Sequence, residues 1–203
     1  MQTAPRQQSP LAPEVEAELQ MFAQQVAALQ RGERDPDDFK RFRLENGVYG
    51  IRGTTDQHMI RVKIRFGALT ADQLDVLADL AEQFTPTQQG HITTRQDVQF
   101  HHIALADVPT VLRRLANCGL TTREACGNTV RNVTCCPFAG IASDEPFDVT
   151  PHADAVSSFF LRNPLNQNLP RKFKIAVNGC TTDHAKVAIH DLGLVAQMRD
   201  GQR

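Results

Sequence analysis

The sequence predicts an α+β fold: an antiparallel sheet with helices on one face, followed by part of a second α+β domain. Two segments near residues 58–66 and 90–105 alternate apolar and polar side chains with the period of a strand. Each precedes a segment whose apolar residues recur at helical spacing. The order strand, helix, strand, helix is typical of a sheet covered by helices. With 203 residues, 41% of them hydrophobic, the chain can bury the core of one sizeable domain or two small ones.

A leader and an N-terminal helix are assigned to residues 1–34. Pro13 suits the first turn of a helix, and apolar residues follow at intervals of four and three until Gly32, namely Val15, Leu19, Phe22, Val26 and Leu29. Residues 33–46 are dense in charge, which we interpret as a surface arm rather than a core element.

The first α+β region is assigned to residues 35–120, including this arm. Its first strand, residues 58–66, has a wholly cationic face made of Arg61, Lys63 and Arg65. Thr70 with Gln73 forms the pattern of a capping box at the start of a helix. A second strand region spans residues 90–105, and the helix after it stops at Gly119.

The remainder, residues 121–203, is assigned to the first part of a second domain. Its stretches rich in Thr, Asn, Gly and Cys have weak periodicity, which is typical of loops that carry function. We expect a short helix over residues 154–162, a strand over 173–177, and a strand or short helix over 187–195.

Charge and cysteine content limit the function. The chain has 22 Lys and Arg against 23 Asp and Glu, a net charge of -1, so nothing global favours nucleic acid or an anionic membrane as a partner. The sequence has no run approaching the roughly 20 apolar residues of a spanning helix. Five cysteines without framework spacing suit a reducing compartment. We therefore expect a soluble, cytoplasmic protein.

Cations recur in four segments that the sequence predicts to be ordered. Arg and Lys that converge on a partly desolvated pocket bind an oxyanion through charge-assisted hydrogen bonds and can stabilise developing charge or donate protons. The alternative is that each cation is the solvated face of a half-buried strand. Periodicity leaves both interpretations open for these residues: Arg61, Arg95, Arg131, Lys172 and Lys174.

Several segments, in this order, resemble the sirohaem-dependent sulfite and nitrite reductases. The matching segments begin near residue 35 and continue to the end of the chain: Gly47-Val-Tyr-Gly, Met59-Ile-Arg-Val-Lys, His91-Ile-Thr-Thr-Arg-Gln, Glu124-Ala-Cys-Gly-Asn-Thr-Val-Arg-Asn-Val, Pro137-Phe-Ala-Gly and Arg171-Lys-Phe-Lys-Ile. The resemblance implies a ferredoxin-like half domain followed by the start of a sirohaem-binding α+β domain, a plan that the two halves of the full enzyme repeat.

The resemblance also implies cofactors and site residues. The cofactors are sirohaem and a coupled [4Fe–4S] cluster, which deliver electrons to the bound anion. By position, the catalytic residues at the anion site are Arg61, Arg131, Lys172 and Lys174. The residues expected near the sirohaem carboxylates are His91, Arg95 and Gln99, and His91 stands where some relatives have Arg.

The function that this resemblance implies is that of the N-terminal half of an assimilatory sulfite reductase, which reduces sulfite to sulfide. The alternatives are reduction of nitrite to ammonia by the same family, or a non-catalytic fragment that binds an anion or a tetrapyrrole. The implied partners are a ferredoxin or flavoprotein electron donor and the missing C-terminal half.

The cysteines depart from the family pattern. The cluster takes its thiolates from a Cys-x5-Cys and a Cys-x3-Cys pair, and neither spacing occurs here. We therefore expect the cluster ligands in the missing half, and we expect the chain alone to be an inactive, truncated piece. Tyr49 and Cys126 are interpreted as a half-buried phenol and a buried thiol.

A structural zinc site is a further possibility, built from Cys135, Cys136, Cys180 and His184. These are ligand types that zinc prefers, but a vicinal cysteine pair does not easily place both sulfurs on one tetrahedron. The sequence analysis therefore assigns no metal ligand.

Overall fold

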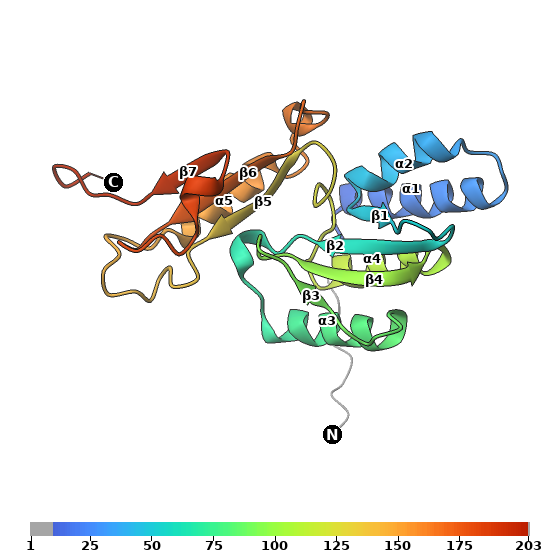
Figure 1. Ribbon diagram of the computed structural model, residues 1–203, viewed down its shortest axis with the longest axis horizontal. Coiled ribbons are helices and arrows are strands. Elements are labelled where there is room, and N and C mark those ends of the chain that lie inside the picture. Colours follow the sequence, from blue (N-terminus) through green and yellow to red (C-terminus); the bar gives the residue numbers. More distant parts are fainter. Residues whose placement is uncertain (1–9, 203) are drawn as a thin grey trace, which may run out of the picture.

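The structure, a computed structural model, describes residues 10–202 (Figure 1). The first nine residues of the predicted leader lie outside the described part. Helices and an antiparallel sheet form one body, and a small parallel sheet with one helix forms a second body beside it (Figure 1). This mixed architecture confirms the predicted α+β fold class. Across residues 10–202, no helix has both the length and the apolar character that crossing a membrane requires.

The first sheet contains four antiparallel strands in the order β1-β2-β4-β3. The strands are β1 (Val48–Gly50), β2 (Gln57–Val62), β3 (His91–Ile92) and β4 (Val98–Ala104). The region predicted as one strand over residues 90–105 is therefore a hairpin, β3 and β4, joined by a turn. The strand predicted over residues 58–66 ends at Val62, and a 3-10 turn (Arg65–Gly67) follows. Another 3-10 turn, Leu105–Asp107, leads from β4 into the next helix.

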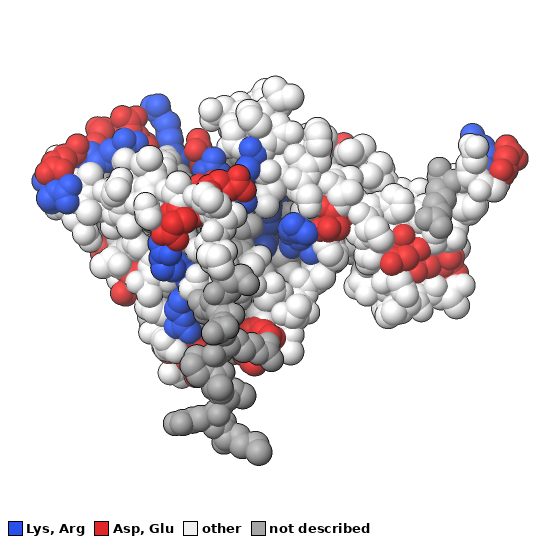
Figure 2. All heavy atoms as spheres, turned by 180° about the vertical axis from the view of Figure 1, so that it is seen from behind, with Lys and Arg blue, Asp and Glu red and all other residues white. Residues whose placement is uncertain are grey.

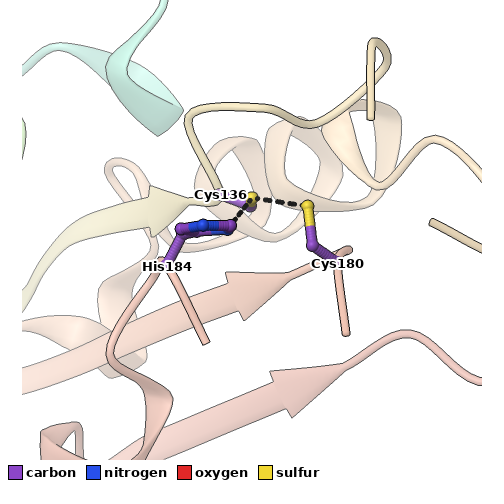
Figure 3. Close-up of side chains that lie close together, drawn as sticks. All are labelled: Cys136, Cys180 and His184. Carbon is purple, nitrogen blue, oxygen red and sulfur yellow. Dashed lines mark hydrogen bonds between the residues drawn. The ribbon is translucent and has the colours of Figure 1, made fainter. Parts of the chain in front are cut away.

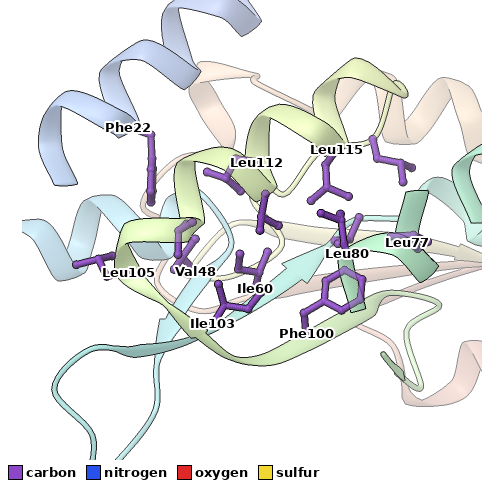
Figure 4. Close-up of a cluster of buried hydrophobic side chains, with 14 of the residues drawn as sticks. Phe22, Val48, Ile60, Leu77, Leu80, Phe100, Ile103, Leu105, Leu112 and Leu115 are labelled. Carbon is purple, nitrogen blue, oxygen red and sulfur yellow. The ribbon is translucent and has the colours of Figure 1, made fainter. Parts of the chain in front are cut away.

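Four helices contribute to one hydrophobic core with this sheet (Figure 4). They are α1 (Pro13–Gln30), α2 (Pro36–Glu45), α3 (Ala71–Phe84) and α4 (Val108–Asn117). The Thr70–Gln73 capping box at the start of α3 is confirmed. Phe22 and Val26 of α1 are buried in the same core as the sheet residues, so α1 packs with the half domain.

Helix α2 replaces the predicted surface arm. Asp35 caps it by accepting from the backbone nitrogens of Asp37 and Asp38, at 2.9 and 3.0 Å. Phe39 is 2% exposed and lies against the ring of Phe22, with centroids 6.3 Å apart. Phe42 is partly buried and stacks on the same ring, with centroids 5.5 Å apart, so the charged residues of the segment surround an apolar stripe that the charge pattern concealed.

The second sheet is parallel, in the order β5-β6-β7. Its strands are β5 (Val130–Cys135), β6 (Phe173–Asn178) and β7 (Leu192–Val195), and helix α5 (Thr150–Phe160) connects the first two. Two 3-10 turns, Pro164–Asn166 and Val187–Ile189, precede β6 and β7. All six residues of β5 are buried, so the strand shows no alternation and escaped prediction.

A buried ion pair joins the two bodies. Glu124 is 0% exposed, and its carboxylate lies 3.6 Å from the ammonium of Lys63, which is 3% exposed. The same carboxylate accepts from the Arg162 backbone nitrogen at 2.9 Å, the Gln167 amide at 2.7 Å and the Asn166 amide at 3.1 Å. Lys63 continues from β2, whereas the other three donors lie next to α5, so Glu124 connects both sheets.

Close backbone approach fixes the start of β1. Gly47 has a φ of +77°, and a Cβ built there would lie 2.2 Å from the Thr122 carbonyl oxygen. Any side chain at this position would therefore push the strand away from the connection between the two bodies.

Replacing Glu124 by Ala should destabilise the chain by about 3–5 kcal/mol, because the buried ammonium of Lys63 would lose its only carboxylate partner among the described residues and three further donors would lose this acceptor. Urea denaturation measures this change. The matched control is Glu16→Ala, which breaks a partly exposed pair with Arg113 at 2.8 Å and should move the midpoint far less. Equal shifts for the two variants would contradict the role given to Glu124.

Candidate functional site

A cavity of about 200 Å³ collects cations from four elements. Arg61 comes from β2, Arg95 from the turn between β3 and β4, and Arg131 from β5. Lys172 and Lys174 come from the start of β6. The remaining lining residues are Thr93, Thr94 and Asp97. The five cations that the sequence singled out therefore share one cavity, at which residues from both sheets meet.

Arg61 is held by its strand neighbours. Across the ladder it pairs with Gln99, which pairs in turn with His91, so the three side chains share one face of the sheet. With the amide oriented to satisfy both groups, Gln99 Oε1 accepts from Arg61 Nε at 2.9 Å. The guanidinium also lies 5.7 Å from the ring centre of Tyr49 and donates to the Ala125 carbonyl at 3.3 Å.

Of the three residues predicted to contact the cofactor, Arg95 lines the cavity but Gln99 and His91 do not. Gln99 is 8% exposed and its amide is used to hold Arg61. His91 is exposed at the edge strand β3, where its ring lies 6.4 Å from that of His101. Both residues lie on the same sheet face as the cavity, one row further out in the case of His91.

Arg95 projects from a turn that is fastened to β5. The Thr93 hydroxyl accepts from the backbone nitrogens of Arg95 and Asp97 at 3.2 and 3.1 Å. Asn132, fully buried in β5, donates to the Arg95 carbonyl at 2.9 Å. Gln96 donates to the Cys135 carbonyl at 2.7 Å, and its Oε1 accepts from that residue's backbone nitrogen at 3.0 Å. Arg95 Nε is buried without a partner among the described residues, which leaves a donor available for a ligand.

The cations on the second sheet differ in their partners. Arg131 is 8% exposed and donates to the Gly127 carbonyl at 3.0 Å. Lys174 lies 3.2 Å from the carboxylate of Asp191, whereas Lys172 is exposed. Within residues 10–202, four of the five cations form no ion pair, Lys174 being the exception. Lys174 is therefore paired with a carboxylate whereas the other four cations are not, and Asp97 is the one acidic residue among the described residues that line the cavity.

The predicted cationic face of residues 58–66 divides in the structure. Arg61 lines the cavity, but Lys63 is buried against Glu124 and Arg65 pairs with Asp154. Burial lowers the pKa of Lys63, and the charge of Glu124 opposes this effect. A strand face that reads as uniform in sequence thus supplies one cation to the cavity and two to ion pairs.

Asp97 is the cavity residue that sequence reasoning missed. It is 3% exposed, and burial raises the pKa of its carboxyl to about 7, with the charges of Arg61 and Lys63 acting in the opposite direction. A signal was present, since a carboxylate two residues after Arg95 stands at the entrance of a strand that the pattern predicts to be buried. Near neutral pH this group can hold or release a proton beside the cations.

Cys126 and Tyr49 lie next to the same cations. Cys126 is fully buried, and burial raises the pKa of its thiol to about 12, while Arg61, Arg131 and a hydrogen bond with Tyr49 act in the opposite direction. The thiol is therefore protonated and packed, as the sequence interpretation expects of a buried cysteine.

Charge elsewhere is more evenly distributed. Figure 2 shows the rear face, where basic and acidic side chains are interspersed over the end that carries α1 and α2. A larger cavity, about 800 Å³, lies between the start of α1 and residues 119–123. The seven predicted site residues are not among the described residues that line it. The smaller cavity is therefore the candidate site.

Two adjoining α+β bodies meet at a cavity lined by five cations, an arrangement that would suit an anion. The sequence matches two domain families, the nitrite/sulfite reductase ferredoxin-like half domain over residues 49–118 and the nitrite and sulphite reductase 4Fe-4S domain over residues 126–203. The chain belongs to the family of nitrite and sulfite reductases.

Relatives of both kinds are similar to the chain. A ferredoxin–nitrite reductase of Leptolyngbya laminosa is 36% identical over 77% of this chain and 31% of its own length. An assimilatory ferredoxin-dependent nitrite reductase of Haloferax mediterranei is 34% identical over 89% and 32%. A ferredoxin sulfite reductase of Mycolicibacterium paratuberculosis is 37% identical over 60% and 22%. The chain thus spans about a third of the length of the first two relatives.

Solved structures agree with the fold. The structure of the Mycobacterium tuberculosis NirA protein matches with a TM-score of 0.73 and 27% identity, over 92% of this chain and 38% of that one. A dissimilatory sulfite reductase I, at 14% identity and a TM-score of 0.60, shows the fold alone.

The cysteines of this chain do not fit a [4Fe–4S] cluster. Such a cluster takes four cysteine thiolates. Within the described residues, two thiols approach each other, Cys136 and Cys180, while Cys135 belongs to the apolar core of the second body. Cys118 and Cys126 lie elsewhere. The five thiols of this chain therefore do not form a four-thiolate set.

Asp97→Asn should change how stability depends on pH. The pKa of this carboxyl is raised from 3.8 to about 7, so the folded state binds a proton that the unfolded state has released. The protonated carboxyl therefore contributes to the free energy of unfolding fully below about pH 4, and this contribution is lost as pH rises through 7. The stability of the Asn variant should not decline in this way, so its stability relative to the wild type should increase between pH 4 and 8. Urea midpoints across that range test the prediction, and parallel curves for the two proteins would contradict it.

Proposed function

We propose that this chain is the N-terminal, anion-binding half of an assimilatory sulfite reductase. The observation that carries the proposal is the convergence of Arg61, Arg95, Arg131, Lys172 and Lys174 on one cavity. The guanidinium of Arg61 is held by the amide of Gln99, and that of Arg131 donates to the Gly127 carbonyl. Guanidinium groups fixed in this way suit directional binding of an oxyanion.

The cavity has the size of a small anion site. About 200 Å³ holds an oxyanion with several waters, but lies below the 300–1,000 Å³ typical of pockets for larger organic ligands. It would therefore take the oxyanion and acid groups of a cofactor rather than a tetrapyrrole ring.

The donor set fits the carboxylates of sirohaem. Arg95 has a buried Nε without a partner among the described residues, and this donor could bind an acid group. When bound, sirohaem would supply the iron that passes electrons to the anion. The chain's own contribution would be to bind and orient: Arg61, Arg131, Lys172 and Lys174 hold the anion, and Arg95 holds a cofactor acid group. Asp97, with its pKa near 7, would hold a proton beside them.

Sulfite is the substrate that we propose, with nitrite as the second candidate. We propose sulfite because the amino-acid sequence of residues 124–133 resembles that of bacterial sulfite reductases. The observation that supports nitrite is that the relatives that match over 160 and 191 residues are nitrite reductases. Both anions bind through the same cations. We propose ferredoxin as the electron donor because the names of these relatives include it. The thiolates of the iron–sulfur cluster would come from a C-terminal half, and the assembled enzyme would work in the cytoplasm.

Reconstitution tests the proposal. The chain is co-expressed with a C-terminal half that carries the two cysteine pairs, in cells supplied with sirohaem. We expect sirohaem absorption and sulfite-dependent oxidation of a reduced dye when both halves are present, with sulfide as product. Ammonia from nitrite at a higher kcat/KM would establish the second candidate, and failure to bind sirohaem in any combination would refute both.

Variants of the assembled enzyme separate the predicted roles. Lys174→Ala should lower turnover roughly 100-fold while sirohaem content stays near that of the wild type, because this cation acts on charge that develops on the substrate. Unchanged turnover would rule out the assignment.

Arg95→Ala should instead lower the sirohaem content of the purified protein, measured by absorbance against protein concentration. Arg171→Ala is the matched control for both variants, since Arg171 is exposed beside Lys172 but does not line the cavity. Full sirohaem occupancy in Arg95→Ala would contradict its predicted role.

A further inference from the structure

We propose that Cys136, Cys180 and His184 form a binding site for one thiophilic metal ion of the zinc class, separate from the cationic cavity. The three side chains converge at one end of the parallel sheet (Figure 3). Their ligand atoms all lie within 4.8 Å of one another. Two thiols and an imidazole are the ligand types that Zn²⁺ prefers.

The spacing is close to that of a tetrahedral site. The two sulfurs are 3.2 Å apart, and Cys136 Sγ lies 3.8 Å from His184 Nδ1. A tetrahedral zinc with bonds of about 2.3 Å to sulfur and 2.0 Å to nitrogen would separate these pairs by roughly 3.8 and 3.6 Å. The two sulfurs would have to move about 0.6 Å apart, and the Cys180 and His184 ligand atoms, which lie within 4.8 Å of each other, would have to close to a similar separation. Side-chain shifts of up to about an ångström would therefore seat the ion.

The structure removes the objection that the vicinal pair raised. The side chain of Cys135, the last residue of β5, packs in the apolar core of the second body. Cys136, the next residue, joins Cys180 instead. Successive residues of an extended chain point in opposite directions, so the pair supplies one ligand and one core side chain. The site needs one sulfur from it, not two.

The segment that carries the other two ligands is organised by a buried amide. Asn178, 2% exposed at the end of β6, donates to the carbonyls of Cys180 and Thr182 at 2.7 and 3.1 Å. Its oxygen accepts from the Ala185 backbone nitrogen at 3.3 Å. The loop is thereby shaped before any ion binds. Phe138 holds the imidazole of His184 from the side, with ring centres 4.8 Å apart.

Negative charge and an open position complete the site. Asp144 accepts from the backbone nitrogen of Thr181, the residue after Cys180, at 3.0 Å, and its carboxylate would attract a cation to the same place. Glu145 Oε2 is buried without a partner among the described residues, and a Cβ built on Gly179 would lie 2.9 Å from it. The cluster supplies three ligand atoms from the described residues, so the fourth coordination position would be left to water.

Metal analysis of the 203-residue chain tests the proposal. The chain is purified under reducing conditions from zinc-supplemented medium and analysed by mass spectrometry of elements. We expect about one zinc per chain, and, after exchange with Co²⁺, the visible absorption of a tetrahedral site with thiolate ligands. Less than a tenth of an equivalent of zinc, or iron with acid-labile sulfide in its place, would overturn the assignment.

Matched cysteine variants locate the ion. Cys136→Ser and Cys180→Ser should each lose the zinc, and His184→Gln should weaken zinc affinity at least about tenfold. Cys118→Ser and Cys135→Ala should retain it, because neither thiol belongs to the cluster. Equal retention by Cys136→Ser and Cys118→Ser would refute the site.

Two further measurements on the wild-type chain keep the test decisive if a variant fails to fold. Competition against a chromophoric chelator should show one zinc bound with a Kd below the micromolar range, and weaker binding would overturn the proposal. The rival state of the two thiols is a Cys136–Cys180 disulfide, which would prevent zinc binding. The intact mass of the chain, measured without reductant, detects this disulfide because its formation removes two hydrogens.

Discussion

The arrangement of this protein depends on a carboxylate that is buried at the junction of its two bodies. Glu124 is fully buried, and a buried charge is tolerated only when it is paired and hydrogen-bonded. Lys63 supplies the charge from the first sheet, and donors beside α5 supply the hydrogen bonds. Asn166, one of those donors, also accepts from the backbone nitrogen of Val130, where β5 begins. Satisfying one carboxylate therefore places Arg131, the next residue of β5, opposite Arg61.

The cationic cavity arises from which cations are paired and which are not. Lys63 and Arg65, from the same segment as Arg61, end in ion pairs, as does Arg162 beside α5. Of the cations that line the cavity, Lys174 pairs with Asp191, whereas the other four form no ion pair among the described residues. Amide side chains hold Arg61 and the turn that carries Arg95. A chain with a net charge of -1 can therefore present a concentrated positive site, because Asp97 is the one acidic residue among the described residues that line this cavity.

The second body has two chemically distinct regions. The start of β6 carries Lys172 and Lys174 to the cationic cavity, whereas the far ends of β5 and β6 carry the thiols of Cys136 and Cys180. Parallel strands point in the same direction, so their opposite ends gather different residues. The family relationship refers to an iron–sulfur domain, but the thiol end of this sheet offers two sulfurs and one imidazole, a set suited to a single ion.

The sequence by itself determined the α+β class, the capped helix α3 and the five cations at the cavity, because these depend on local periodicity and on segments that resemble a family. It did not determine β5, whose complete burial erases alternation, or α2, where a single buried Phe39 stands among charges. Nor could it separate Arg61 from Lys63, or Cys136 from Cys135, since each pair looks equivalent along the chain. Tertiary structure decided these cases, because a side chain's partner is set by which distant segment packs against it, and local spacing does not encode that contact.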